Sequence, residues 1–143
     1  MSINTLVATP TASLLVAPQS LGPEAEAISA AMLDYALGWY DGDAARMTRA
    51  LHPALAKRAT LPDETGTLTL SEYPAEALIA RVARTKPEDY AQAARARKVT
   101  LFAVHGNTAA GLLEMDGWTD FMHLVKVDGA WKVINILWEP MAD

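Results

Sequence analysis

The sequence predicts an α+β fold, with helices in the first half of the chain and an antiparallel sheet in its last third. Between residues 28 and 39, apolar side chains recur at spacings of three and four, which is typical of an amphipathic helix. Residues 99–138 instead form short apolar runs separated by Gly-Asn and Asp-Gly pairs, which is typical of β-hairpins. Because the helices precede the strands and do not alternate with them, the pattern favours α+β architecture.

The composition is that of a single ordered domain. The chain has 143 residues, of which 51% are hydrophobic and 20% are charged, so it can bury one sizeable core. It contains no cysteine, which excludes disulfides and thiolate-based metal sites and fits a reducing compartment. The net charge of −5 disfavours nucleic acid as a partner.

The N-terminal segment differs from the rest of the chain. Residues 1–22 form an apolar arm without a charged side chain, which we expect to pack either on the domain or on a partner subunit. The arm has no basic start and is interrupted by Pro10 and Pro18, unlike a secretory signal, and no run is long enough to span a bilayer. We therefore expect a cytoplasmic protein without a membrane partner, whose single domain occupies residues 23–143.

Two helices are predicted in the first half. Pro23 suits the first turn of a long helix that ends near Asp41-Gly42. Asp43 is a good N-cap for a second helix, which Pro53 ends. One face of the long helix carries Ile28, Met32, Tyr35 and Trp39.

The remaining elements are a short strand, a third helix and the sheet. Residues 67–70 alternate as a strand does, and a helix is predicted to begin at Pro74. Turns at residues 106–107, 116–117 and 128–129 predict three antiparallel hairpins in series. If the last turn has two residues, the two faces of the final hairpin can be assigned from the alternation of its side chains. One face carries Phe121, His123, Ile136 and Trp138, and the other carries Asp120, Met122, Leu124 and Leu137.

Both faces of this hairpin are largely apolar. An antiparallel sheet with one solvated face would alternate cleanly between apolar and polar residues, so we expect both faces to be covered. The helices can cover one face, and a second copy of the chain can cover the other. On that outer face, the charge of Asp120 predicts an ion pair at the dimer interface.

Two segments carry a resemblance to a known family. GWYDGDAARMTRALHP, residues 38–53, resembles the helix, Gly-Asp break and second helix of the nuclear-transport-factor-like superfamily, whose cone-shaped members are also called SnoaL-like. DFMHLVKVDGAWKVINILWEP, residues 120–140, is similar to the last hairpin of that superfamily. The combination looks most like the group labelled putative lumazine-binding.

The resemblance implies a cone-shaped α+β barrel, in which a curved antiparallel sheet wraps around the long N-terminal helix and leaves a pocket. In such cones the position of Trp138 points into the pocket and that of Leu137 points to a partner subunit. With the predicted register, His123 then lies on the inner face. Glu114, which pairs with Thr119 across a two-residue turn, lies on the same face near the mouth of the pocket. The resemblance also implies a homodimer formed through the outer face of the sheet.

The superfamily includes ketosteroid isomerase, polyketide cyclases and scytalone dehydratase. In ketosteroid isomerase a tyrosine of the first helix and a protonated carboxylic acid stabilise an oxyanion. The matching positions here are Tyr35 and His123, whereas the position of the general base falls near Ala59. The resemblance therefore leaves both catalysis and simple binding open.

The leading hypothesis is a small-molecule-binding or accessory protein for an apolar or flat heterocyclic ligand, in which His123 and Tyr35 supply polar contacts. The alternative is an isomerase, dehydratase or cyclase that uses His123 as acid or base and Tyr35 to stabilise an oxyanion. A third possibility is a protein-interaction module. The three histidines fall on separate elements, so we expect no metal and no other cofactor. The predicted ligand-binding residues are Tyr35, Trp39, Glu114, Phe121, His123, Ile136 and Trp138.

Overall fold

The computed structural model describes residues 21–91 and 95–142, so most of the predicted N-terminal arm lies outside the described residues. The helices of this part are α1 (Ala25–Asp41), α2 (Ala44–Ala50), α3 (Ala75–Ala83) and the short 3₁₀ helix η2 (Pro87–Asp89). The strands are β1 (Leu51–Pro62), β2 (Leu68–Pro74), β3 (Arg97–His105), β4 (Thr108–Met115), β5 (Trp118–Val127) and β6 (Ala130–Pro140).

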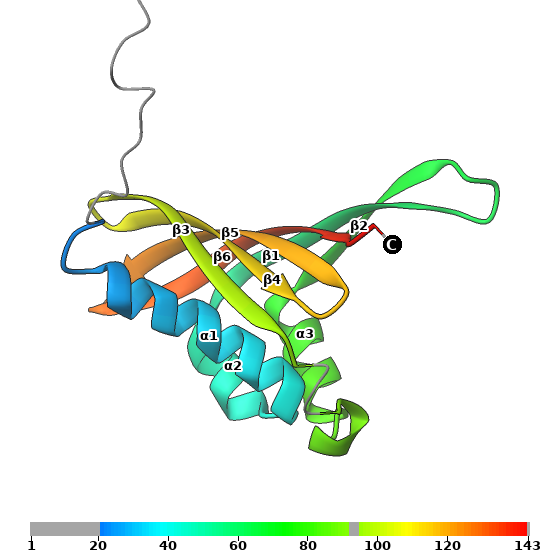
Figure 1. Cartoon of the computed structure of the whole chain (residues 1–143), viewed down its shortest axis with the longest axis horizontal. Coiled ribbons are helices and arrows are strands. Elements are labelled where there is room, and N and C mark those ends of the chain that lie inside the picture. The colour runs from blue at the N-terminus through cyan, green and yellow to red at the C-terminus, as the bar shows by residue number, and fades with distance from the viewer. Residues whose placement is uncertain (1–20, 92–94, 143) are drawn as a thin grey trace, which may run out of the picture.

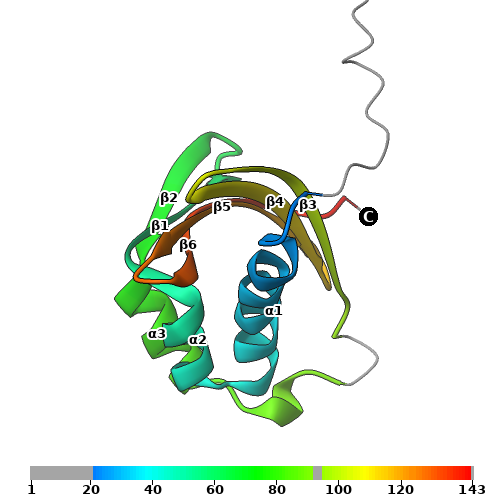
Figure 2. The same ribbon diagram turned by 90° about the vertical axis from the view of Figure 1, so that its left-hand side faces the viewer.

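The six strands form one curved, open sheet in the order β2-β1-β6-β5-β4-β3. All neighbouring strands are antiparallel except β1 and β6, which are parallel, so the sheet is mixed. The helices lie on its concave side, and the hairpin of β1 and β2 projects beyond them (Figure 1). In Figure 2 the strands arch over α1. The predicted α+β class and the curved sheet around the first helix are confirmed. Strand β1 was not predicted, and it joins β2 to the strands of the last third of the chain.

Helix α1 fills the hollow of the sheet with the face that its apolar spacing predicts. Ile28, Met32 and Tyr35 are fully buried, and Trp39 is half-buried at the C-terminal end of the helix. The start of α1 is tied to the last hairpin, because the Glu24 carboxylate accepts hydrogen bonds of 2.7 Å from Lys126 Nζ and Trp131 Nε1. These bonds lower the pKa of Glu24.

The final hairpin departs from the predicted register at Ile134. His123 pairs with Asn135 while its neighbour Leu124 pairs with Val133, which leaves Ile134 as the extra residue of a β-bulge. A bulge sets two residues of one strand against one of the other, so every side chain beyond it changes face relative to the partner strand. Ile136 and Trp138 of β6 therefore lie on the concave face as predicted, but the faces predicted for the residues of β5 are wrong.

The bulge reverses the two faces of β5 relative to the prediction. Asp120, Met122 and Leu124 are buried on the concave face, whereas Phe121 and His123 are exposed on the convex face. The expected ion pair of Asp120 across a dimer interface is therefore wrong as well. Glu114 pairs with Thr119 as predicted. It nevertheless lies between the buried Leu113 and Met115, so it is on the convex face and not on the inner one.

The glycine that ends α1 has a constrained backbone, which can be tested by substitution. Gly42 and Gly106 both have left-handed backbone angles, with φ of 63° and 57°. A Cβ at Gly42 would collide with the carbonyl group of Thr85, whereas a Cβ at Gly106 would have no heavy atom within 4 Å. Gly106→Ala should lower the free energy of unfolding by about 1–2 kcal/mol, the cost of the left-handed conformation. Gly42→Ala should cost about 1–3 kcal/mol more through overpacking.

Urea denaturation of the two variants checks this difference, and Gly106→Ala is the matched control for backbone strain. Equal losses in the two variants would contradict the close packing of α1 against the segment that follows α3.

Candidate functional site

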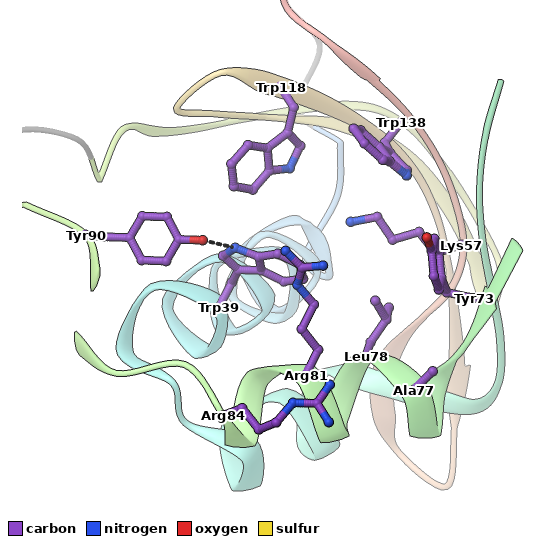
Figure 3. Close-up of a pocket in the computed structure, with 10 residues that line it drawn as sticks. All are labelled: Trp39, Lys57, Tyr73, Ala77, Leu78, Arg81, Arg84, Tyr90, Trp118 and Trp138. Atoms are coloured by element: carbon purple, nitrogen blue, oxygen red, sulfur yellow. Dashed lines mark hydrogen bonds between the residues drawn. The ribbon is translucent and has the colours of Figure 1, made fainter. Parts of the chain in front are cut away.

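A cavity of about 420 Å³ opens on the concave side of the sheet, where the C-terminal end of α1 meets α3 and the strands β1, β2, β5 and β6. Figure 3 shows the side chains that face it. Its lining residues are Trp39, Lys57, Tyr73, Ala77, Leu78, Arg81, Arg84, Tyr90, Trp118 and Trp138.

Aromatic rings form most of the wall. The rings of Trp39 and Trp118 meet edge to face, with centroids 5.8 Å apart. The indole nitrogen of Trp39 donates a hydrogen bond of 2.9 Å to the hydroxyl of Tyr90, which fixes the orientation of the Trp39 ring. Trp138 faces them from β6 (Figure 3). The cavity therefore offers three large, partly anchored aromatic surfaces.

Lys57 of β1 brings a positive charge into this aromatic environment. Its side chain is almost completely buried, with the whole residue 4% exposed, and its Nζ donates a hydrogen bond of 2.7 Å to the Tyr35 hydroxyl. The same Nζ lies 4.9–5.4 Å from the ring centres of Tyr35, Trp39 and Trp138, which is cation–π range. The ammonium group thus replaces its water shell largely with aromatic faces and one hydroxyl.

Asp120 of β5 is the counter-charge. It is 0% exposed, and its Oδ1 lies 3.6 Å from Lys57 Nζ while its Oδ2 accepts a 3.0 Å hydrogen bond from the indole of Trp118. Within the described residues, Asp120 Oδ1 and the indole nitrogen of Trp138 are buried polar atoms without a hydrogen-bond partner. The pair is therefore held together but is incompletely hydrogen-bonded.

Burial shifts the ionisation of all three groups. It lowers the pKa of Lys57 and raises that of Asp120, and in each case the attraction of the opposite charge opposes the shift. Burial and the nearby Asp120 raise the pKa of Tyr35 well above its usual value of 10.0, so Tyr35 is a neutral hydroxyl at neutral pH. Such a cluster can hold a polar group of a ligand and can also donate or accept a proton.

Two arginines extend the positive charge toward the mouth of the cavity. Arg81 belongs to α3 and Arg84 directly follows it, and both are exposed. The guanidinium carbon of Arg81 lies 5.4 Å from the ring centre of Trp39, so the two planar groups are in cation–π contact. The wall of the cavity thus combines rings with cations.

Residues 23–139 match the protein family described as "Putative lumazine-binding". The chain belongs to this family. The resemblance read from residues 38–53 and 120–140 is thereby confirmed. A comparison with curated proteins finds no match.

Solved structures share the fold of this family member at low sequence identity. An NTF2-like protein of unknown function from Shewanella baltica OS155 is 20% identical, with a TM-score of 0.64 over 84% of this chain and 95% of its own. One from Silicibacter pomeroyi DSS-3 is 19% identical, with a TM-score of 0.63 over 86% and 100% of the two chains. A ketosteroid isomerase-like protein from Erwinia carotovora atroseptica SCRI1043 is 10% identical, with a TM-score of 0.57 over 85% and 99%. These similarities establish a nuclear-transport-factor-like fold, and its chemistry has to be argued from the residues of this chain.

The structure separates the predicted site residues of this family member into two groups. Trp39 and Trp138 line the cavity, Tyr35 lies beside it as the hydrogen-bond partner of Lys57, and Ile136 is buried on the same face. Glu114, Phe121 and His123 lie on the convex face instead. His123 Nδ1 is 3.4 Å from the side-chain amide of Asn135, and it is not brought near Tyr35. The prediction that His123 and Tyr35 face the same pocket is therefore wrong.

Sequence reasoning missed Lys57, Asp120, Trp118 and the two arginines. A signal for Lys57 was present, because it stands between Leu55 and Ala59, at an inward position of an alternating segment. The partner Asp120 could not be placed without knowing of the bulge at Ile134.

Among the described residues no cluster of His, Asp or Glu has the arrangement of a metal site. No described helix is long and apolar enough to cross a membrane.

The buried ion pair of Lys57 and Asp120 predicts how the free energy of unfolding changes when one or both residues are replaced. Lys57→Met leaves Asp120 buried without its cation and should lower the free energy of unfolding by about 3–5 kcal/mol at pH 7. Adding Asp120→Leu removes the unpaired charge, so the double variant should recover to within about 1 kcal/mol of the wild type. Lys98→Met is the matched control, because Lys98 pairs with Glu114 at 4.0 Å on the surface and should cost about 0.5 kcal/mol or less.

The same variants have a defined pH dependence. Burial raises the pKa of Asp120, so the folded protein takes up a proton on this group at a higher pH than the unfolded chain does. The destabilisation by Lys57→Met is therefore largest at neutral pH and should shrink as the pH falls toward about 4, the usual carboxyl range. Urea denaturation between these pH values measures the trend. A single variant that is as stable as the double variant at pH 7 would contradict the buried pair.

Proposed function

We propose that this protein binds a small planar molecule in the cavity between Trp39, Trp118 and Trp138. The observation that carries this proposal is the combination of a 420 Å³ cavity with aromatic walls and a buried, incompletely paired Lys57–Asp120 cluster beside it. Small-molecule sites are typically apolar cavities of a few hundred Å³ with a few convergent polar groups. The description of the family as putatively lumazine-binding supports a flat heterocycle as the kind of ligand.

The arrangement of the rings supports a planar ligand over a bulky one. Aromatic pairs are most favourable when they are offset-stacked or edge to face, and Trp39 and Trp118 already meet in the second way. A flat ring entering beside them gains further aromatic contact without rearranging the Trp39–Tyr90 hydrogen bond. Polar edges of the ring can then reach Lys57, which forms part of the cavity wall (Figure 3).

A cavity-filling substitution tests this function. Ala77 of α3 lines the cavity, whereas Ala80 of the same helix is exposed and outside its lining. The indole side chain of Ala77→Trp should fill part of the cavity and weaken lumazine binding at least about tenfold. Ala80→Trp should bind lumazine like the wild type. Quenching of tryptophan fluorescence measures the binding of lumazine, and native mass spectrometry shows any small molecule retained through purification.

Two outcomes would contradict the function. One is a wild-type protein that neither retains a small molecule nor responds to lumazine. The other is equal ligand binding by the two alanine variants, which would place the ligand outside this cavity.

We also propose that the convex face of the sheet pairs two copies of the chain. Leu137 of β6 and Phe121 of β5 are neighbours in register there, and they are 56% and 53% exposed. Phe102 of β3 is 49% exposed, and it lines one surface groove together with Phe121 and Leu137. Exposed apolar side chains that gather on one sheet face favour an interaction surface, and a two-fold axis would let the same patch serve both copies.

A charge on this face tests the pairing. Leu137→Glu should shift the sedimentation coefficient from that of a dimer to that of a monomer, because the carboxylate would be desolvated in the interface. Ala45→Glu introduces the same charge at an exposed position of α2, on the other side of the sheet, and should leave the dimer intact. A wild-type protein that sediments as a monomer at micromolar concentration would contradict the pairing.

A further inference from the structure

The charges around the cavity are one-sided. Its lining includes three cationic side chains, Lys57, Arg81 and Arg84, and no carboxylate. Asp120 is the one acidic group in contact with Lys57 among the described residues. The protein as a whole has a net charge of −5, so this excess of positive charge is a local feature and does not follow from the composition.

The cations are also incompletely paired. Lys57 has three N–H donors, of which one is given to Tyr35, and Asp120 Oδ1 at 3.6 Å is too distant for a short hydrogen bond. Within the described residues, the guanidinium groups of Arg81 and Arg84 have no carboxylate within ion-pair distance and donate no hydrogen bond to a side chain or backbone. Water can satisfy a surface arginine, whereas an almost completely buried lysine has little contact with bulk water. The site therefore has positive charge available for a ligand.

The positions of these groups indicate the shape of a ligand that the cavity can bind. Arg81 lies against the ring of Trp39 at 5.4 Å, and Lys57 approaches the same ring at 4.9 Å, so a ligand ring near Trp39 has both cations within reach of its edge. Figure 3 shows Arg81 and Lys57 directed toward the same space from α3 and β1. A guanidinium presents a planar fork of donors that matches a carboxylate, whereas an ammonium acts as a point charge.

We propose that the ligand is a planar aromatic acid, whose ring lies among the tryptophans and whose carboxylate is bound by Lys57 and Arg81. This inference rests on the proposed function and adds the charge and the chemical class of the ligand. A neutral ring of the same shape gains the aromatic contacts but leaves the cations without an anion. Arg84, which directly follows α3, contributes attraction at the mouth of the cavity.

A matched pair of probes tests the charge directly. 2-Naphthoate and 2-naphthamide have the same ring system and differ in that one is an anion and the other is neutral. Isothermal titration calorimetry at pH 7.5 and low salt should give at least about a tenfold lower Kd for the acid, because charge-assisted hydrogen bonds are about twice as strong as neutral ones. Raising the salt concentration should reduce this preference, since part of it acts at the exposed mouth.

Substitutions assign the preference to the two cations. Arg81→Gln should reduce naphthoate affinity several-fold and naphthamide affinity much less, a difference that general damage to the fold would not produce. The double variant Lys57→Met with Asp120→Leu removes the buried cation without leaving an unpaired charge, and it should abolish the remaining preference. Arg49→Gln is the control, because it removes the same charge from an exposed position of α2 outside the cavity lining.

The outcomes separate this inference from the proposed function. Equal affinity for the two naphthalenes, or an acid preference that survives in both cavity variants, would overturn the aromatic acid while leaving planar-ligand binding intact. Failure of naphthoate to bind at all would also overturn the aromatic acid, and the lumazine and native mass spectrometry experiment then decides separately whether the cavity binds any ligand. A preference that falls equally in Arg49→Gln would show an effect of net charge alone, which contradicts the assigned contact.

Discussion

The buried pair of Lys57 and Asp120 is the interaction on which the character of the site depends. The two residues lie on β1 and β5, on either side of β6, so they connect strands that are far apart in the sequence. Taking two such charges out of water costs several kcal/mol per ion, and their attraction offsets this only with good geometry and further hydrogen bonds. Tyr35, Trp118 and three aromatic faces supply part of that compensation.

Because a pair of well-packed apolar residues would stabilise the fold at least as well, stability does not explain the pair, and this supports the proposed binding site. Its polar atoms are positioned by strands, which are more rigid than loops, and both side chains are almost completely buried beside the cavity. The arginines of α3 lie nearer to solvent, where their charge is screened but can still attract an anion to the mouth. Burial and exposure thus give the cations different roles at the same cavity.

The comparison with solved structures separates what the fold provides from what this chain provides. Proteins that are 10–20% identical share the helices and the curved sheet with TM-scores of 0.57–0.64. The fold places the C-terminal end of α1 beside the concave face of the sheet, and a cavity formed there can serve many chemistries. Here the chemistry comes from a lysine on β1, an aspartate on β5 and arginines on α3, so function has to be inferred from those side chains and not from the architecture.

The sequence by itself determined the α+β class, the apolar face of α1, the three hairpin turns and the family, because these depend on local periodicity, on turn residues and on short motifs. It also placed Trp39 and Trp138 toward the interior. Tertiary structure decided the faces of β5, since the single extra residue at Ile134 reverses the alternation and moves His123 outward and Asp120 inward. It also brought Lys57 to Asp120 through the parallel pairing of β1 with β6, a contact between residues 63 positions apart that no local pattern specifies.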